Sequence, residues 1–378
     1  MTQVTALPVA ENALRQQNAV FIIAGLGAGG VEKVVSLIAT AWITKGWQVT
    51  ILAFDRPEDP IYHDFHPAVE IRRLGLSSGG GKIRSVIMQG RRILAIRRAL
   101  NLLQPDIVIS LLTKINLLTL VATIGTSHKV IVSERNNPQA QPANAAWNIL
   151  LARFYGRAEA IVMQTRASMD CLPPNVRAKA RIIPNPILPP QSSQLINMER
   201  RVVSAVGRLT YQKGFDLLID AFARIASRHP DWKLMIWGEG EMRPALEMQV
   251  RALGLNDQIL LPGTSEIPGG WVHETAIMAL SSRFEGFPNA LGEAMASGLP
   301  VVAFDCPFGP SDLIIQGIDG LLIPPGDVPA LARAIERLIV DQQLRKCLGS
   351  AARRSVSRLT PTRIVAQWEV LVRESLTT

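Results

Sequence analysis

Residues 283–302, RFEGFPNALGEAMASGLPVV, decide the fold because a loop, a helix and a buried strand follow one another in them. Ala, Leu, Glu and Met favour helix, so ALGEAMASG is predicted to be helical, with Gly298 as its stop. The apolar runs AIMALSS (276–282) and LPVVAFD (299–305) on either side are typical of buried strands. A strand, a helix and a strand in this order predict a parallel βαβ unit.

The same alternation extends over most of the chain. Further strands are expected at AVFIIAG, WQVTILAF, DIVISLL, KVIVSE and AIVMQT in the first half, and at RVVSAVG, WKLMIWGEG and QILLPG in the second. Between the halves, the proline-rich stretch 181–200 excludes regular structure and indicates a linker. With 378 residues, the chain is also too long for one ordinary core.

We therefore predict an α/β protein with two doubly wound, Rossmann-like domains that face a cleft. The predicted boundaries are an N-terminal domain over 1–185, a linker over 186–200 and a C-terminal domain over 201–378, whose last helix is free to pack back on the first domain. Ligands of open α/β sheets bind beyond the carboxyl ends of the strands, so the cleft is the expected site.

The basic excess lies in the first half of the chain. Residues 1–190 contain 21 Lys and Arg against 11 Asp and Glu, whereas residues 191–378 contain 19 against 20. A nucleic-acid partner is not expected, because aromatic residues make up only 5% of the chain and no recognition motif occurs. Three cysteines without short spacing predict a reducing, cytoplasmic setting, and neither a membrane span nor an export signal is expected.

The segment KIRSVIMQGRRILAIRRAL contains much of that basic excess. As a helix, it places an apolar stripe among basic residues of the region Lys82–Arg98; the stripe consists of Ile83, Val86, Ile87, Ile93 and Leu94. Such a helix can lie in the interface of an anionic membrane. The alternative is a helix that packs on its own sheet with solvated arginines opposite.

Two carboxylates flank the start of the helix in 283–302. Glu285 lies on the preceding loop and Glu293 one turn inside the helix. A helix N-terminus suits a phosphate, and carboxylates suit sugar hydroxyls, so the layout fits a phosphorylated sugar compound held from both sides. The alternative is that Glu285 caps the helix and Glu293 is a solvated surface charge. We expect the Glu285 loop to be exposed in the cleft.

A glycine-rich loop follows the first strand and includes Gly29 and Gly30. Glycines let the backbone approach a ligand closely. The loop also suits a dinucleotide fold, with Asp55 as the acid after the second strand, so an NAD-dependent oxidoreductase is an alternative.

Two further segments of the second half indicate a diphosphate. Arg208 and Lys213 share a loop between a strand and a helix, where two cations can neutralise charge on a departing nucleotide. Gly238 and Gly240 flank Glu239 after the next strand. For a loop Arg or Lys, plain solvent exposure is the alternative.

The segment from Glu285 to Val302 resembles the donor site of retaining, nucleotide-sugar-dependent glycosyltransferases of family 4, which have the GT-B fold. The resemblance rests on a Glu, seven intervening residues and a second Glu before AMASGLPVV, and on similar motifs around Arg208, Lys213 and 238–240. It implies that Arg208 and Lys213 bind the diphosphate, that Glu293 binds the ribose, and that Gly29 and Gly30 face the donor phosphate. The implied sugar-orienting groups are Glu285 and the backbone near Phe287, Pro288 and Asn289.

The resemblance implies transfer of a hexose, with retention, to a glycan or lipid-linked acceptor in bacterial cell-surface polysaccharide synthesis. A UDP-sugar is the preferred donor and GDP-mannose its alternative. No Asp-x-Asp motif occurs, so neither a metal nor another cofactor is expected. A cytoplasmic enzyme, peripheral on the inner face of the plasma membrane, fits the basic helix.

One loop departs from the family pattern. Where many members have a His after the strand equivalent to KVIVSE, this chain has Glu134, Arg135 and Asn136. Glu134 and Arg135 are therefore candidate acceptor contacts, with a structural ion pair as the alternative. A non-catalytic sugar-nucleotide or polysaccharide-binding protein is a further hypothesis, which the intact set of cations and carboxylates disfavours.

Overall fold

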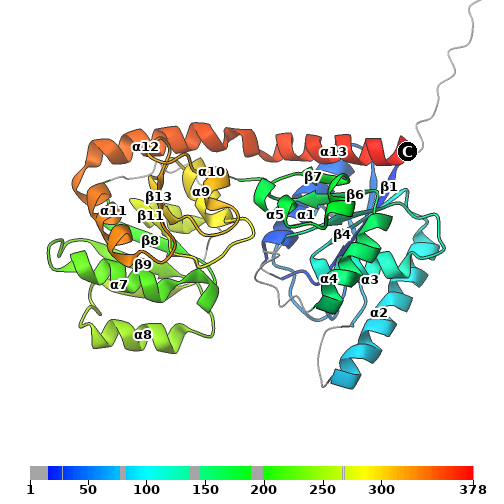
Figure 1. The fold of residues 1–378 in the computed structure, drawn as a ribbon, viewed down its shortest axis with the longest axis horizontal. Helices are drawn as coiled ribbons and strands as arrows, with labels where there is room; N and C mark the ends of the chain where they lie inside the picture. The colour runs from blue at the N-terminus through cyan, green and yellow to red at the C-terminus, as the bar shows by residue number, and fades with distance from the viewer. Residues whose placement is uncertain are drawn as a thin grey trace, which may run out of the picture.

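The computed structural model describes residues 16–27, 29–76, 82–135, 145–188, 199–265, 267 and 269–377. These residues form two β-sheets, each built of parallel strands, which lie side by side in separate domains (Figure 1). The first has the order β3-β2-β1-β4-β5-β6-β7. Its strands are β1 (Asn18–Ile23), β2 (Gln48–Ala53), β3 (Glu70–Arg73), β4 (Ile107–Leu111), β5 (Val130–Ser133), β6 (Ala160–Met163) and β7 (Ala180–Ile182).

The second sheet has the order β10-β9-β8-β11-β12-β13. Its strands are β8 (Val202–Val206), β9 (Lys233–Trp237), β10 (Ile259–Gly263), β11 (Ile277–Leu280), β12 (Val301–Phe304) and β13 (Leu321–Ile323). In both sheets the order reverses beside the first strand of the domain, between β1 and β4 and between β8 and β11. This is the doubly wound topology, and the predicted fold class is confirmed.

Helices cover both faces of each sheet. The first domain has α1 (Gly30–Ile43), α2 (Lys82–Leu103), α3 (Thr113–Ala122), α4 (Ala145–Phe154), α5 (Arg166–Asp170) and α6 (Pro174–Arg177). The second has α7 (Phe215–Ala226), α8 (Arg243–Ala252), α9 (Asn289–Ala296), α10 (Pro310–Leu313), α11 (Val328–Val340) and α12 (Gln342–Ser355). The strands β4 and β5, like β11 and β12, are buried along their whole length, as central parallel strands require.

One apolar core runs through both domains. It joins the α1 side of the first sheet to α9 and includes Ile183 and Ile187 from the segment between the domains. The Ile187 N–H donates to the Leu359 carbonyl at 2.8 Å, and the Ile187 side chain packs on Gly292, where a Cβ would lie 2.1 Å away. The domains are therefore joined by packed side chains as well as by the chain itself.

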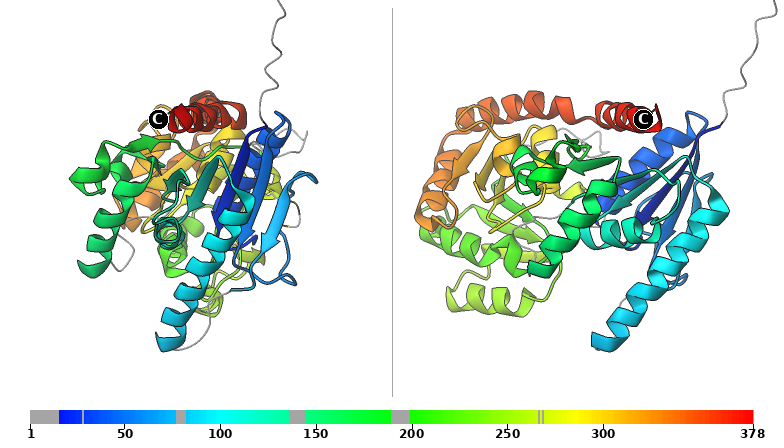
Figure 2. Two further views of the ribbon diagram at one scale, coloured as in Figure 1. Left: turned by 90° about the vertical axis from the view of Figure 1, so that its right-hand side faces the viewer. Right: turned by 45° about the vertical axis from the view of Figure 1, so that its right-hand side comes forward.

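The last helix, α13 (Pro361–Thr377), returns to the first domain, and the views in Figures 1 and 2 show α12 and α13 running along one side of the molecule from one domain to the other. Trp368 of α13 is fully buried in the shared core. Lys45 pairs with Glu369 at 2.6 Å, and Lys129 donates to the carbonyls of Ser375 and Leu376 at the end of the helix. A cation at the last carbonyls of a helix stabilises it.

Of the two predictions for the basic segment, packing on the sheet is confirmed for one face of α2, and the membrane contact of the opposite face stays a prediction. Ile96 and Leu100 are buried against the sheet, whereas Val86, Ile87 and Leu94 are 72%, 59% and 54% exposed. Arg92, expected at the rim of the stripe, is buried and donates to the Leu76 carbonyl. The side chains of Lys82, Ile83 and Arg84 lie outside the described set. No helix of the described residues is both long and apolar enough to cross a bilayer.

Truncation of Trp368 tests how strongly α13 holds the first domain. Trp368→Ala is expected to lower the free energy of unfolding by about 3–5 kcal/mol, because a large buried side chain leaves a cavity. Val370→Ala on the same helix is the control, since Val370 is 52% exposed, and it is expected to change little. Chemical denaturation measures both, and equal losses in the two variants would contradict the role of Trp368.

Candidate functional site

A cavity of about 710 Å³ lies between the domains, at the carboxyl ends of their central strands. Its first-domain wall consists of residues 29–32 with Leu112, Arg135, Gln164 and Asn185. Its second-domain wall consists of Gly207, Arg208, Gln212 and Lys213 and of residues 284–287 with Asn289. The loops after β1 and β4 thus meet those after β8 and β11, where the strand order of each sheet reverses.

Lys213 and Glu285 form the centre of the second-domain wall. The Lys213 ammonium lies 2.7 Å from Glu285 Oε1, which also accepts a hydrogen bond of 2.6 Å from the Ser282 hydroxyl. The loop of Glu285 lines the cleft, but the residue itself is only 4% exposed, so the expectation of an exposed Glu285 is wrong. The carboxylate turns inward to its two donors, and Glu285 does not cap α9.

A left-handed glycine brings the two loops together. Lys213 ends a short 3₁₀ helix, η2 (Tyr211–Lys213), and Gly214 follows with φ +60°. A Cβ on Gly214 would lie 2.2 Å from the Ser281 carbonyl oxygen, so only glycine allows this approach. Arg283 completes the connection with an ion pair of 2.6 Å to Asp216 at the start of α7.

Arg208 also lines the second-domain wall, but its side chain has surroundings that differ from those of Lys213. Its side chain is exposed, and in the described part of the structure it forms no ion pair or side-chain hydrogen bond. Its loop is fixed by the next one, because the Leu209 N–H donates to the Glu239 carbonyl at 2.9 Å. Arg208 is therefore a cation that faces the cavity from a firmly held backbone.

Gly238 and Gly240 lie behind that loop and do not line the cavity. A Cβ on Gly238 would lie 2.0 Å from the Gly207 carbonyl oxygen, and one on Gly240 would lie 2.4 Å from that of Leu209. These glycines let the loop after β9 pack directly on the loop that carries Arg208. Their position gives them a supporting place in the site.

The beginning of α9 connects the two walls. Phe287 and Asn289 line the cavity, and Pro288 precedes the helix without a side-chain cap. The Asn185 amide donates to Asn289 Oδ1 at 2.8 Å. Within α9, Glu293 does not line the cavity; its Oε1 accepts from the Lys33 ammonium of α1 at 2.6 Å. The alternative of a solvated surface charge at Glu293 is therefore wrong.

The glycine loop of the first domain faces α9. Gly29 and Gly30 line the cavity, and a Cβ on Gly30 would lie 2.4 Å from the Asn289 amide nitrogen. Asp55 holds this loop by accepting the Leu26 N–H at 3.0 Å, which is a structural task. His63, from the segment before β3, lies with Nε2 3.0 Å from the Gly29 carbonyl oxygen.

Glu32 follows the glycine loop in the first turn of α1 and lines the cavity. Its carboxylate lies against Gly29, where a Cβ would meet Oε2 at 1.9 Å. Burial raises the pKa of Glu32, and the nearby Asp55 carboxylate adds to this rise. No cation pairs with Glu32 in the described residues, so its charge is free to act on a ligand.

The side chains of Glu134 and Arg135 have different surroundings, although the two residues are neighbours in the sequence. Glu134 is buried beneath the cavity, where it accepts hydrogen bonds from Thr113, Asn116 and Tyr155, and burial raises its pKa. Arg135 lines the cavity, and the two do not form the ion pair considered as an alternative. Asn136 lies outside the described residues.

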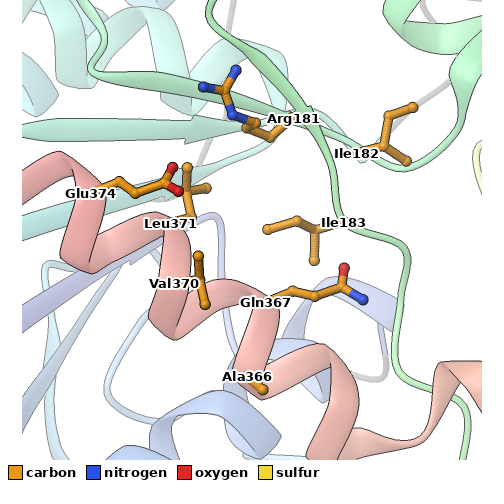
Figure 3. A pocket seen from close by; sticks show the side chains of 8 residues that line it. All are labelled: Arg181, Ile182, Ile183, Ala366, Gln367, Val370, Leu371 and Glu374. Atoms are coloured by element: carbon orange, nitrogen blue, oxygen red, sulfur yellow. The ribbon is translucent and has the colours of Figure 1, made fainter.

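Sequence reasoning missed the first-domain residues Glu32, Gln164 and Asn185, and Gln212 of the second. Glu32 and Gln212 lie beside marked residues, next to the glycine loop and to Lys213, but their residue types give no signal of a role. Gln164 and Asn185 follow β6 and β7, where no motif occurs, and only the topology brings them to the cavity. A second hollow, of about 370 Å³, lies between β7 and α13 and contains none of the predicted residues (Figure 3). In the described residues, no three His, Cys, Asp or Glu side chains come together as metal ligands would.

The environment of Glu32 predicts a pH-dependent effect on stability. Glu32→Gln is expected to raise the melting temperature at pH 7, because the folded state then no longer contains a desolvated charge. Below the ordinary pKa of 4.5, both folded and unfolded chains are protonated at Glu32, and the gain disappears. As the pH rises through the higher pKa of the folded state, the wild type loses stability that the variant keeps.

Thermal unfolding between about pH 4 and pH 8 measures this difference, because the range begins below the ordinary glutamate pKa and extends past neutrality. Glu58→Gln is the control, because Glu58 is an exposed carboxylate of the same domain. A melting temperature of Glu32→Gln that stays parallel to the wild type across this range would contradict the account of Glu32.

Two family profiles match consecutive parts of the chain. Residues 28–189 match the family described as Glycosyltransferase Family 4, and residues 191–355 match Glycosyl transferases group 1. Together they span both domains and every loop of the cavity.

Similar proteins come from several bacteria. An exopolysaccharide phosphotransferase of Streptomyces coelicolor is 32% identical over 286 residues, which is 74% of this chain but only 30% of that protein's length. An alpha-1,4-N-acetyl-D-galactosaminyltransferase of Campylobacter jejuni, whose name includes PP-undecaprenol, is 26% identical over 94% of this chain and 98% of its own.

Solved structures share the fold. A sucrose-phosphate synthase from Thermosynechococcus elongatus gives a TM-score of 0.83 with 20% identity, over 96% of this chain and 100% of its own. Anabaena HepE in complex with UDP-glucose gives a TM-score of 0.76 with 18% identity, over 96% and 100%. With both profiles matched and the two-domain fold shared, the chain belongs to the family 4 glycosyltransferases and has the GT-B fold.

Proposed function

We propose that this glycosyltransferase transfers a hexose from a UDP-sugar to a glycan or lipid-linked acceptor in cell-surface polysaccharide synthesis, with retention at the anomeric carbon. The observation that carries the proposal is the convergence of Arg208, Lys213 and Glu285 on one interdomain cavity, opposite the glycine loop at Gly29 and Gly30. Two cations and a carboxylate on one wall suit a diphosphate joined to a sugar.

In the proposed reaction, the bond between the anomeric carbon and the diphosphate oxygen breaks. The acceptor oxygen forms its bond on the same face of the sugar, and its proton passes to the departing diphosphate. Arg208 and Lys213 stabilise the charge that develops there, and the Lys213–Glu285 pair holds the ammonium in place. Glu285 and the backbone at Phe287 and Asn289 orient the sugar. Glu293, which lies behind the cavity wall and is bound by Lys33 in the free protein, turns from Lys33 to accept hydrogen bonds from the ribose.

Relatives support the choice of substrates. The Anabaena structure contains UDP-glucose, which favours uridine in the donor, and GDP-mannose is the alternative. The Campylobacter jejuni relative is named for an undecaprenol-linked substrate, which favours a lipid-linked acceptor. A thermal-shift panel of UDP, GDP, ADP and NAD separates these donors, because a ligand of the folded state raises its melting temperature. Stabilisation by NAD alone would contradict the proposal.

Arg208 offers the cleanest test of catalysis, because its substitution breaks no ion pair among the residues that the structure describes. Arg208→Gln is expected to lower kcat for sugar transfer by about 100-fold or more, as for other removed charge-stabilising groups, and to leave the melting temperature of the free protein unchanged. Arg251→Gln is the matched control, an exposed arginine of the same domain outside the cavity. Full activity of Arg208→Gln would remove the cation-assisted step. A non-catalytic binding protein would show no turnover even before substitution.

In the proposed function, the exposed apolar stripe of α2 contacts the cytoplasmic face of the plasma membrane. Val86, Ile87 and Leu94 are exposed beside Arg91 and Arg98, both of which are also exposed. The N-terminal part of α2 extends beyond the sheet in Figures 1 and 2, where a flat surface can reach it. Apolar burial plus attraction to anionic lipid suits such a helix.

Sedimentation with vesicles checks this contact. Binding to vesicles that contain anionic phospholipid is expected to weaken between about 0.05 and 0.5 M salt, because screening shortens the reach of surface charge. Val86→Ser with Leu94→Ser is expected to weaken it further, whereas Val340→Ser, an exposed position of the second domain, is not. Equal binding to zwitterionic vesicles would contradict an electrostatic contribution.

A further inference from the structure

Arg135 is a buried cation with no counterion among the described residues. It is 7% exposed, its Nε donates to the Ser133 hydroxyl at 2.8 Å, and its Nη1 donates to Asn185 Oδ1. Its Nη2 is buried and has no hydrogen-bond partner within the described part of the chain. No carboxylate pairs with it in the part of the chain that the structure describes, since neighbouring Glu134 is bonded elsewhere.

Such a cation is costly to keep. A charge taken out of water without a partner costs several kcal/mol, and burial lowers the pKa of Arg135 to about 9. The guanidinium is still charged at neutral pH. Its neutral contacts, two oxygens and the Trp368 ring at 5.7 Å, fix its position but do not neutralise it.

The position of Arg135 shows where an anion can reach it. Arg135 follows β5 and lines the interdomain cavity on the first-domain wall, beside Gln164 and Asn185. Gln164 donates to Asn185 Oδ1 at 2.8 Å, so both amides and the guanidinium form one polar surface. Arg208 and Lys213 face the cavity from the other domain. The cavity thus has a cation on each wall.

We propose that Arg135 anchors a second anion subsite of this cavity, on the wall opposite Arg208 and Lys213, and that it holds a phosphate group of a substrate. A planar guanidinium with a free Nη2 suits phosphate oxygens, and the ligand supplies the missing counterion. This subsite rests on the proposed function, because the transfer supplies two sources of phosphate. One is the acceptor, when it is diphosphate-linked, and the other is the diphosphate of the donor.

The test measures ligand-induced thermal shifts with UDP, and with inorganic pyrophosphate added to protein saturated with UDP. The proteins are wild type, Arg135→Gln, Arg135→Lys and Arg208→Gln. If Arg135 binds a phosphate of the acceptor, pyrophosphate raises the melting temperature of the UDP-bound wild type. Arg135→Gln then loses this pyrophosphate shift but keeps the shift caused by UDP. If Arg135 instead binds the donor diphosphate, Arg135→Gln weakens UDP binding by about 10- to 100-fold, as expected for a lost charge-assisted hydrogen bond. Pyrophosphate then causes no further rise in the melting temperature of the UDP-bound protein.

Two variants separate binding from a structural role. Arg135→Lys keeps the charge and is expected to retain part of the affected shift. Trp368→Leu removes the ring beneath the guanidinium and is expected to lower the melting temperature while it keeps both ligand shifts. If Arg135→Gln only lowers the melting temperature and keeps both shifts, Arg135 is a clamp for α13 and the proposal is overturned. A UDP shift that is lost in Arg208→Gln supports the donor site independently of this result.

Discussion

The ion pair between Lys213 and Glu285 is the interaction on which the second-domain wall of the cavity depends. It joins the loop after β8 to the loop after β11, with both side chains largely buried. Loss of one partner of such a pair costs about 3–5 kcal/mol, because the other charge stays buried alone. Gly214, with φ +60° against the Ser281 carbonyl, allows the loops to come this close. The backbone of Arg208 and the start of α9 are placed by these same loops.

The two domains share more than this cavity. The apolar core continues through Ile187 into α9, and α13 crosses back to the first sheet with Trp368 buried there. Across the cleft, Lys33 binds Glu293 and Asn185 binds Asn289. If Glu293 accepts hydrogen bonds from a ribose as proposed, its carboxylate must be shared with or released by Lys33. Donor binding and the relative position of the domains are then coupled through one side chain.

The sequence predicts the two sheets well because their central strands are continuous apolar runs. It misses β3, β7 and β13, which are edge strands of three or four residues, EIRR, ARI and LLI, too short for a periodic signal. The motif residues Arg208, Lys213, Phe287 and Asn289 come together at the cavity as their strand ends predict. Burial of Glu285 and the partners of Glu293 depend on contacts between distant loops, which spacing alone does not encode. The same holds for Glu32 and Asn185.

A crystal structure of the protein with bound UDP tests the central claim most directly. The account predicts the diphosphate in the interdomain cavity, within hydrogen-bond distance of the Arg208 and Lys213 side chains and facing Gly29 and Gly30, with the ribose hydroxyls on Glu293. UDP bound elsewhere, or in the cavity without contact to either cation, would contradict it.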